Sequence, residues 1–146
     1  SGFIKAKELN FDAIITFDAD GQHSPESIEK YIDLLEQGFA VVIGIRSRLQ
    51  RVSESIFSWV AVRRWGIEDP LCGMKAYHID VFDQLGFFDS YKSIGTELSI
   101  FAANQNMKIA QQHVKIKGRQ DRPRLGGRIF TNMVILRSLW MGSRKY

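Results

Sequence analysis

Two aspartates and a glutamine alternate in the segment DADGQ, directly after an apolar run. The run, residues 13–17, is apolar or β-branched and predicts a buried strand. Side chains two positions apart in an extended chain point the same way, so Asp18 and Asp20 can face one point in space. Two carboxylates this close repel each other, and a Mg²⁺ or Mn²⁺ ion shared with phosphates removes the conflict. The spacing therefore favours a metal site, with Gln22 as a further oxygen donor.

The elements around this segment indicate how it is held. Ser24 can cap the helix that follows. Residues 39–45 form a second near-continuous apolar run, typical of a strand buried in a parallel sheet. Strand, helix and strand make a right-handed βαβ unit whose ligand edge lies at the carboxyl ends of the strands. Arg46 and Arg48 are therefore expected beside the two aspartates, where each either neutralises phosphate oxygens or lies on solvated surface.

The rest of the chain continues in alternating helical and strand patterns, which predict an α/β fold. Thr96 is expected to cap a helix that buries Leu98 and Phe101. Lysines in the last predicted strand place it near a sheet edge. The other predicted elements are helices over residues 53–64, 79–85 and 129–141, and strands over residues 74–77 and 108–117.

Length, charge and cysteine content narrow the class of protein. The 146 residues suit one domain, and a single cysteine, Cys72, excludes an internal disulfide framework. No apolar run approaches the ~18 residues of a membrane span, and the first ten residues do not read as a signal peptide. Residues 1–45 carry three basic and eight acidic side chains, whereas residues 46–146 carry 17 basic and eight acidic ones. The basic part suits an anionic partner, which could be a diphosphate, a phospholipid surface or nucleic acid.

The segment DADGQHSPESI resembles the metal and sugar-nucleotide motif of family 2 glycosyltransferases, most closely the branch of dolichyl- and polyprenyl-phosphate sugar synthases. The resemblance implies a Rossmann-like GT-A fold in three layers, α/β/α. It also implies that Asp18, Asp20 and Gln22 hold Mg²⁺ or Mn²⁺ on the diphosphate of a nucleotide-sugar donor. The sugar would pass with inversion to a lipid-phosphate or glycan acceptor.

Three further segments match the family, each with a departure from its pattern. DPLCGMK is similar to the family's Asp-x-x-Cys-Gly-Phe-Lys, which makes Asp69 the candidate base, or only a positioning group if the acceptor is a phosphate. A turn-forming Asp-Pro is the alternative. Glu97 matches an acid that faces the family's site, yet an acid there also suits a helix dipole. The loop after the last strand resembles an arginine-rich family loop in charge alone, on Arg119, Arg122 and Arg124.

The resemblance runs from Asp12 to about Arg137 and begins in the middle of the family's domain. We therefore expect residues 1–127 to form the C-terminal portion of a catalytic domain that is incomplete at its N-terminus, lacking roughly 80 residues. Residues 128–146 are expected to form an amphipathic helix with a basic tail, which packs on the core, meets another subunit or rests on a membrane. The expected location is the cytoplasm, including the cytoplasmic face of a membrane. A homo-oligomer is compatible with these expectations.

Two other classes of protein compete with this interpretation. Strand-Asp-x-Asp-Gly also opens the haloacid dehalogenase-like phosphatases, in which Asp18 would be the nucleophile and Asp20 a general acid. Those phosphatases have Thr or Val where this chain has Gln22, and a later strand ending in paired acids where this chain has Arg46. A nucleic-acid-binding protein would use the basic tail, but no recognised signature supports it. An inactive fragment of the glycosyltransferase is the remaining alternative.

Overall fold

The computed structural model describes residues 2–17, 27–47, 49, 51–88, 95–114 and 128–145, and the side chains of the last helix from Asn132 onward. Within these residues the strands are β1 (Ala13–Thr16), β2 (Val41–Arg46), β3 (Lys75–His78) and β4 (Ile109–Val114). The helices are α1 (Gly2–Glu8), α2 (Ser27–Glu36), α3 (Val52–Trp65), α4 (Ile79–Leu85), α5 (Thr96–Asn104) and α6 (Arg128–Lys145). The predicted elements are therefore present, apart from parts that lie outside the described residues, such as the cap expected at Ser24.

The strands form one mixed sheet in the order β1-β3-β2-β4. Strand β3 runs antiparallel to both β1 and β2, and β4 runs parallel to β2. Strands β1, β2 and β4 therefore point the same way, and their carboxyl ends share one edge of the sheet, as predicted. The sequence did not indicate that β3 would lie between β1 and β2. Strand β4 is an outer strand of the described sheet, which confirms its expected edge position.

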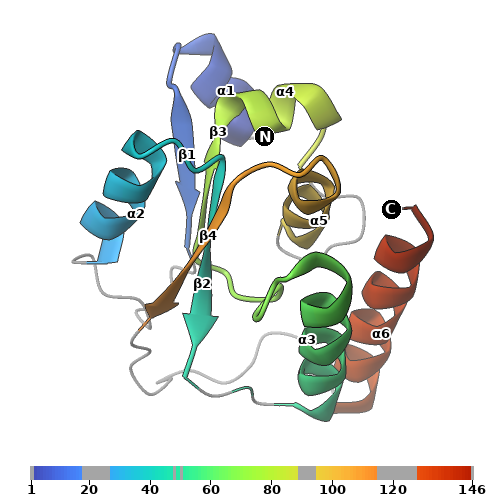
Figure 1. Cartoon of the computed structure of the whole chain (residues 1–146). Coiled ribbons are helices and arrows are strands. Elements are labelled where there is room, and N and C mark those ends of the chain that lie inside the picture. The colour runs from blue at the N-terminus through green and yellow to red at the C-terminus, as the bar shows by residue number, and fades with distance from the viewer. Residues whose placement is uncertain are drawn as a thin grey trace.

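Helices cover both faces of the sheet, so the predicted three-layer α/β/α arrangement is confirmed (Figure 1). Alternate residues of β2 face opposite layers, because successive side chains of a strand point to opposite faces. Val42 packs in one cluster with Tyr31 and Leu35 of α2. Val41 and Ile43 pack in the other cluster, whose buried members from the remaining helices include Phe3, Phe57, Ala61, Val81, Leu98 and Ala102. Among the described residues, no helix combines the length and apolarity needed to span a bilayer.

The start of α5 differs from its prediction. Gly95, and not Thr96, is the N-cap, with a left-handed backbone at φ 68°. Thr96 is the first helical residue, and its buried hydroxyl donates a hydrogen bond of 2.7 Å to the carbonyl oxygen of Pro70. A side chain at Gly95 would collide with the ring of Phe88 and the hydroxyl of Tyr77. The Thr96 side chain thus ties α5 to the segment before β3.

At Gly44 of β2, side chains of α2 and of the segment before β3 approach the strand closely. A Cβ atom there would lie 2.8 Å from the Cys72 Sγ, 2.8 Å from the Tyr31 hydroxyl and 2.9 Å from the Met74 carbonyl oxygen. Burial raises the pKa of the Tyr31 phenol, and burial followed by the charge of Asp69 raises the pKa of the Cys72 thiol. Both groups are therefore neutral packing elements at physiological pH.

Gly44→Ala is expected to lower the free energy of unfolding by about 1–3 kcal/mol, because the added methyl group must displace a backbone carbonyl as well as two side chains. Urea denaturation followed by circular dichroism measures this change. Gly2→Ala is the matched control, since nothing lies within 4 Å of its added Cβ. Equal stability of the two variants would show that the packing around Gly44 is not tight.

Candidate functional site

The predicted site residues divide into those the structure describes and those it does not. Arg46, Asp69 and Glu97 are described. The other predicted site residues lie outside the described residues: Asp18, Asp20, Gln22, Arg48, Arg119, Arg122 and Arg124. In the described part of the chain no group of three acidic, histidine or cysteine side chains could hold a metal ion. The predicted ligands are not in that part, so their role stays a prediction.

The end of β1 meets the segment that carries Asp69. Thr16, two residues before Asp18, is paired with Lys75 of β3. Its hydroxyl donates to the carbonyl oxygen of Gly73 at 3.1 Å, with the Lys75 carbonyl oxygen at 3.3 Å. Lys75 is also paired with Ile43 of β2, three residues before Arg46. The strand that leads into DADGQ and the segment DPLCGMK are therefore neighbours at one edge of the sheet.

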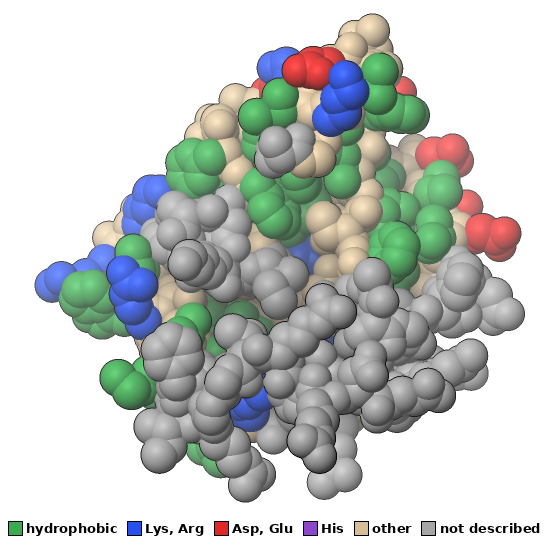
Figure 2. All heavy atoms as spheres, turned by 180° about the vertical axis from the view of Figure 1, so that it is seen from behind, with side chains coloured by type: hydrophobic (Ala, Val, Ile, Leu, Met, Phe, Trp, Pro, Cys, Tyr) green, Lys and Arg blue, Asp and Glu red, His purple; other side chains and the backbone are tan. Residues whose placement is uncertain are grey.

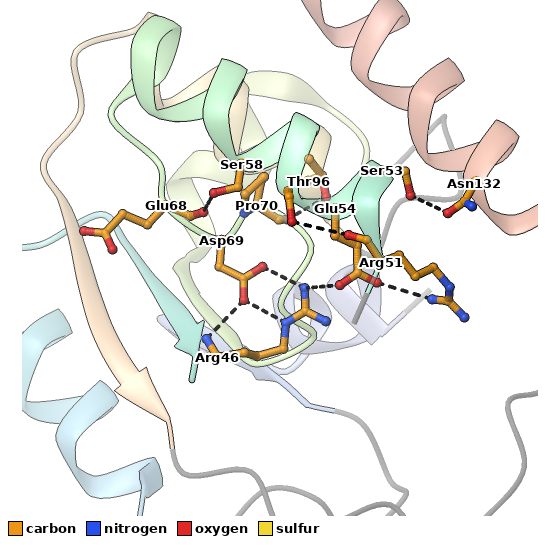
Figure 3. Close-up of polar contacts among 11 residues, drawn as sticks. Arg46, Arg51, Ser53, Glu54, Ser58, Glu68, Asp69, Pro70, Thr96 and Asn132 are labelled. Atoms are coloured by element: carbon orange, nitrogen blue, oxygen red, sulfur yellow. Dashed lines mark hydrogen bonds and ion pairs between the residues drawn. The ribbon is translucent and has the colours of Figure 1, made fainter. Parts of the chain in front are cut away.

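Arg46 and Asp69 form a bidentate ion pair at this edge (Figure 3). The guanidinium Nε donates to Asp69 Oδ2 at 2.7 Å, and Nη2 donates to Oδ1 at 2.8 Å. The backbone N–H of Arg46 adds a third hydrogen bond to Oδ2 at 3.1 Å. The Asp69 carboxylate is 3% exposed and the Arg46 side chain 15%. Arg46 and Asp69, each of which was expected to face a substrate, are thus paired with each other.

Glu54, in the first turn of α3, extends the pair into a chain of four charges. Its carboxylate lies 3.4 Å from Nη2 of Arg46 and 3.3 Å from Nη1 of Arg51, and it is 5% exposed. Burial disfavours the charged guanidinium of Arg46, but the hydrogen bonds and charge of Asp69, together with the charge of Glu54, outweigh it and raise its pKa. Arg46 is therefore permanently charged, and both carboxylates are oriented around it.

Sequence reasoning did not identify Glu54. The available signal was a single acid in the first turn of the helix, and that signal is also explained by the helix dipole. Only the three-dimensional approach of α3 to the end of β2 shows that the side chain turns inward to Arg46 (Figure 3).

Glu97 lies apart from this chain of charges. Its side chain is fully buried in the first turn of α5, and Oε1 accepts a hydrogen bond of 2.7 Å from Nζ of Lys145 in α6. The ammonium group also lies 4.5 Å from the ring centroid of Phe87. The hydroxyl of the neighbouring Thr96 donates a hydrogen bond to the carbonyl oxygen of Pro70, the residue that follows Asp69. The structure therefore places Glu97 one residue from a contact to the Asp69 segment, with α6 as a charge partner.

An open hollow of about 380 Å³ lies beside the ion pair. Arg46 and Asp69 line one part of it, and Ser58 and Val62 of α3 line another. Ser58 is fixed there by the hydrogen bond from its hydroxyl to the carbonyl oxygen of Glu68. The wall of the hollow therefore carries a cation and a carboxylate that are held in one orientation by each other.

Comparison with known proteins gives a consistent family signal. The model of "Glycosyl transferase family 2" matches residues 6–139. An undecaprenyl-phosphate 4-deoxy-4-formamido-L-arabinose transferase of Pseudomonas savastanoi pv. phaseolicola is 35% identical over 81 residues, which are 51% of this chain and 24% of that protein. A UDP-N-acetylglucosamine–dolichyl-phosphate N-acetylglucosaminyltransferase of Methanococcus voltae is 45% identical over 47 residues, 32% of this chain and 19% of that protein.

Solved structures share the fold. Glucosyl-3-phosphoglycerate synthase of Mycobacterium tuberculosis, in complex with Mn²⁺, UDP-glucose and glycerol 3-phosphate, superposes with a TM-score of 0.71 at 17% identity. The match covers 96% of this chain and 51% of that chain. A second structure of the same synthase, with Mn²⁺, UDP and glucosyl-3-phosphoglycerate, gives a TM-score of 0.71 at 19% identity. The chain thus spans about half of these structures and about a quarter or less of the curated relatives.

Arg46→Ala is expected to lower the free energy of unfolding by about 3–5 kcal/mol, because Asp69 and Glu54 would keep buried charges without their shared partner. Chemical denaturation measures the loss. Glu8→Gln, which breaks the exposed ion pair with Lys5, serves as control and should change stability by less than about 0.5 kcal/mol. A loss at Arg46 as small as that of the control would mean that the four charges do not depend on one another.

Proposed function

The chain belongs to glycosyltransferase family 2, and we propose that it forms the metal-binding and acceptor-facing part of an inverting enzyme that transfers a sugar from a nucleotide-diphosphate donor to a polyprenyl-phosphate acceptor. The observation that carries the proposal is the contact of Thr16 with Gly73, which joins the strand before DADGQ to the segment of Asp69. Two curated relatives whose names contain undecaprenyl-phosphate and dolichyl-phosphate support the acceptor class.

The donor site in this proposal consists of Asp18, Asp20 and Gln22, which follow the carboxyl end of β1. Two carboxylates and an amide oxygen are hard donors of the kind that Mg²⁺ and Mn²⁺ prefer. A divalent cation held there supplies positive charge to the diphosphate that leaves the sugar. Mn²⁺ with UDP-glucose in the related synthase structure supports this assignment. Arg48, Arg119, Arg122 and Arg124 remain the predicted contacts to phosphate oxygens.

Asp69 is proposed to position the acceptor and not to deprotonate it. Both oxygens of its carboxylate already accept hydrogen bonds from Arg46, which fixes the side chain in one orientation. A phosphate monoester is ionised at neutral pH, so its oxygen can attack the anomeric carbon without a strong base. Arg46 and Asp69 line the adjacent hollow, which is where the acceptor would lie in this proposal. Glu97 is proposed to act on the site through the Thr96–Pro70 contact.

The location, the domain boundary and the oligomeric state are proposals of smaller scope. A lipid-phosphate acceptor places the enzyme at a membrane surface, on the cytoplasmic side where nucleotide sugars are expected. The division of the chain into a catalytic portion, residues 1–127, and a C-terminal helix with a basic tail, residues 128–146, remains a prediction. A homo-oligomeric state also remains a prediction. The phosphatase alternative has no support from the comparisons, since the matching family and the relatives are glycosyltransferases.

Asp20→Ala is expected to abolish Mn²⁺-dependent binding of the donor, because it removes one of the two carboxylates predicted to hold the cation. Isothermal titration with UDP and GDP sugars, with and without EDTA, measures binding. Asp12→Ala is the matched control, since this exposed aspartate precedes β1 and is not part of the motif. Donor binding that survives in Asp20→Ala would refute the metal role, and absence of binding in the unaltered chain would favour the inactive-fragment alternative.

Asp69→Asn is expected to reduce kcat/KM for a polyprenyl-phosphate acceptor by less than about 100-fold, with the larger effect on acceptor KM, because a positioning group is weakened and no base is lost. Initial rates at varied acceptor concentration measure the split. Asp12→Asn again provides the control. A loss beyond about 10⁴-fold in kcat at unchanged KM would identify Asp69 as the base.

A further inference from the structure

The segment Gly66–Asp69 contains Asp69 and belongs to no helix or strand. Gly66 is the C-cap of α3, with a left-handed backbone at φ 67°, and β3 begins only at Lys75. Ile67 and Asp69 are nevertheless buried. Backbone groups in buried irregular structure need hydrogen-bond partners from elsewhere in the fold. The side chains that supply these partners therefore set the place of Asp69.

Gln111 of β4 supplies two of the partners from a single side chain. Its Oε1 accepts a hydrogen bond of 2.7 Å from the backbone N–H of Glu68, and its Nε2 donates one of 2.8 Å to the carbonyl oxygen of Gly66. These two backbone groups flank Ile67, which is fully buried. A primary amide has both a donor and an acceptor, so it can pair with them as a neighbouring strand would. The segment is thereby joined to the sheet through Gln111.

Both backbone groups of Glu68 are bound by side chains. The N–H is bound by Gln111, and the carbonyl oxygen accepts a hydrogen bond from the hydroxyl of Ser58 in α3 (Figure 3). The next residue is Asp69, whose carboxylate accepts hydrogen bonds from the guanidinium and the backbone N–H of Arg46. Side chains from β4, α3 and β2 thus hold two adjacent residues.

The sheet fixes two of these side chains relative to each other. Strand β4 is parallel to β2, with Gln111 paired to Ile43, and Arg46 lies three residues further along β2. Gln111 and Arg46 therefore extend from neighbouring strands whose spacing is set by the backbone hydrogen bonds of the ladder. The amide that binds Glu68 is consequently held at a fixed place relative to the guanidinium that binds Asp69.

Gln112, the next residue of β4, makes a different contact. Its Nε2 donates to the carbonyl oxygen of the adjacent His113 at 3.1 Å. Successive side chains of a strand point to opposite faces, so Gln112 lies on the face of β4 away from Gln111. Both glutamines are half-buried. Gln112 is therefore a control for Gln111 that matches it in residue type, strand and burial.

The pairing of Asp69 with Arg46 determines how much unpaired negative charge a phosphate acceptor would meet. Glu68 and Asp69 both line the open hollow beside the ion pair, together with residues of α3. Figure 2 shows basic side chains on the side of the molecule where α3 and α6 lie, and acidic side chains on the side of α2. If Asp69 left Arg46, an uncompensated carboxylate would lie at the wall of the hollow and would repel a phosphate.

We propose that Gln111 is a positioning residue for the transfer reaction: its amide holds the segment Gly66–Asp69 in the place where the Asp69 carboxylate stays paired with Arg46. Gln111 does not touch the reacting atoms and acts only through Asp69. The effect on the acceptor rests on the function proposed above, whereas the hold on the segment rests on the contacts alone. The two parts can therefore be tested separately.

Hydrogen exchange in the 146-residue chain, followed by NMR, tests the hold on the segment. In the unaltered chain the Glu68 N–H should exchange slowly although Glu68 is exposed, because Gln111 binds it. Gln111→Met keeps the length of the side chain and removes both hydrogen bonds. It should speed the exchange of the Glu68 N–H and of the Arg46 Nε–H by about 5- to 10-fold. Gln112→Met should leave both rates within about twofold.

Initial rates at varied polyprenyl-phosphate concentration test the effect on the acceptor. Gln111→Met should raise the acceptor KM by about 3- to 10-fold with a smaller change in kcat, and Gln112→Met should change neither by more than about twofold. In a chain that already carries Asp69→Asn, Gln111→Met should raise KM by less than about twofold, because the carboxylate that it positions is gone. A general loss of stability would act alike with and without Asp69→Asn.

Three results would overturn the positioning role. They are a fast-exchanging Glu68 N–H in the unaltered chain, an Arg46 Nε–H whose exchange Gln111→Met leaves unchanged, and an equal rise of KM with and without Asp69→Asn. An unaltered chain that transfers no sugar would instead count against the proposed function. The two exchange measurements would then decide alone whether Gln111 positions Asp69.

Discussion

The buried ion pair between Arg46 and Asp69 is the constraint on which the rest of the site depends. Removing two charges from water is costly, and the cost is offset only if their hydrogen bonds are satisfied in a fixed geometry. That geometry requires the end of β2, the segment before β3 and the first turn of α3 to meet at one place, because Glu54 completes the charge balance. The pair therefore fixes the positions of three elements as well as of one carboxylate.

Much of the scaffold could be predicted from the sequence, because buried strands and amphipathic helices leave local patterns. The runs before DADGQ and before Arg46 are strands, and the helix over residues 79–85 has the predicted bounds. Strand β3 has only four residues, and nothing in so short a run indicates its direction or its neighbours. Its position between β1 and β2 follows from long-range pairing that sequence periodicity does not record.

The position of Arg46 at the edge where the strands end was predictable, and its ion pairs were not. The rule that strand ends of one direction share an edge brought Arg46 close to the expected place of the metal motif. It could not show that the guanidinium turns to Asp69, because that choice depends on burial and on Glu54. Thr96 illustrates the same limit: a threonine before a helical run suggests a cap, whereas tertiary contact directs its hydroxyl to Pro70.

Two adjacent residues of α5 contact two segments that are far apart in the sequence, the end of α6 and the segment before β3. Glu97 receives the ammonium group of Lys145 from the end of α6, and Thr96 holds the carbonyl of Pro70 next to Asp69. Both contacts originate in the same helical turn, so a shift of one alters the geometry of the other. Substitutions at Lys145 and Pro70 should consequently be energetically non-additive, although the two residues are far apart in sequence.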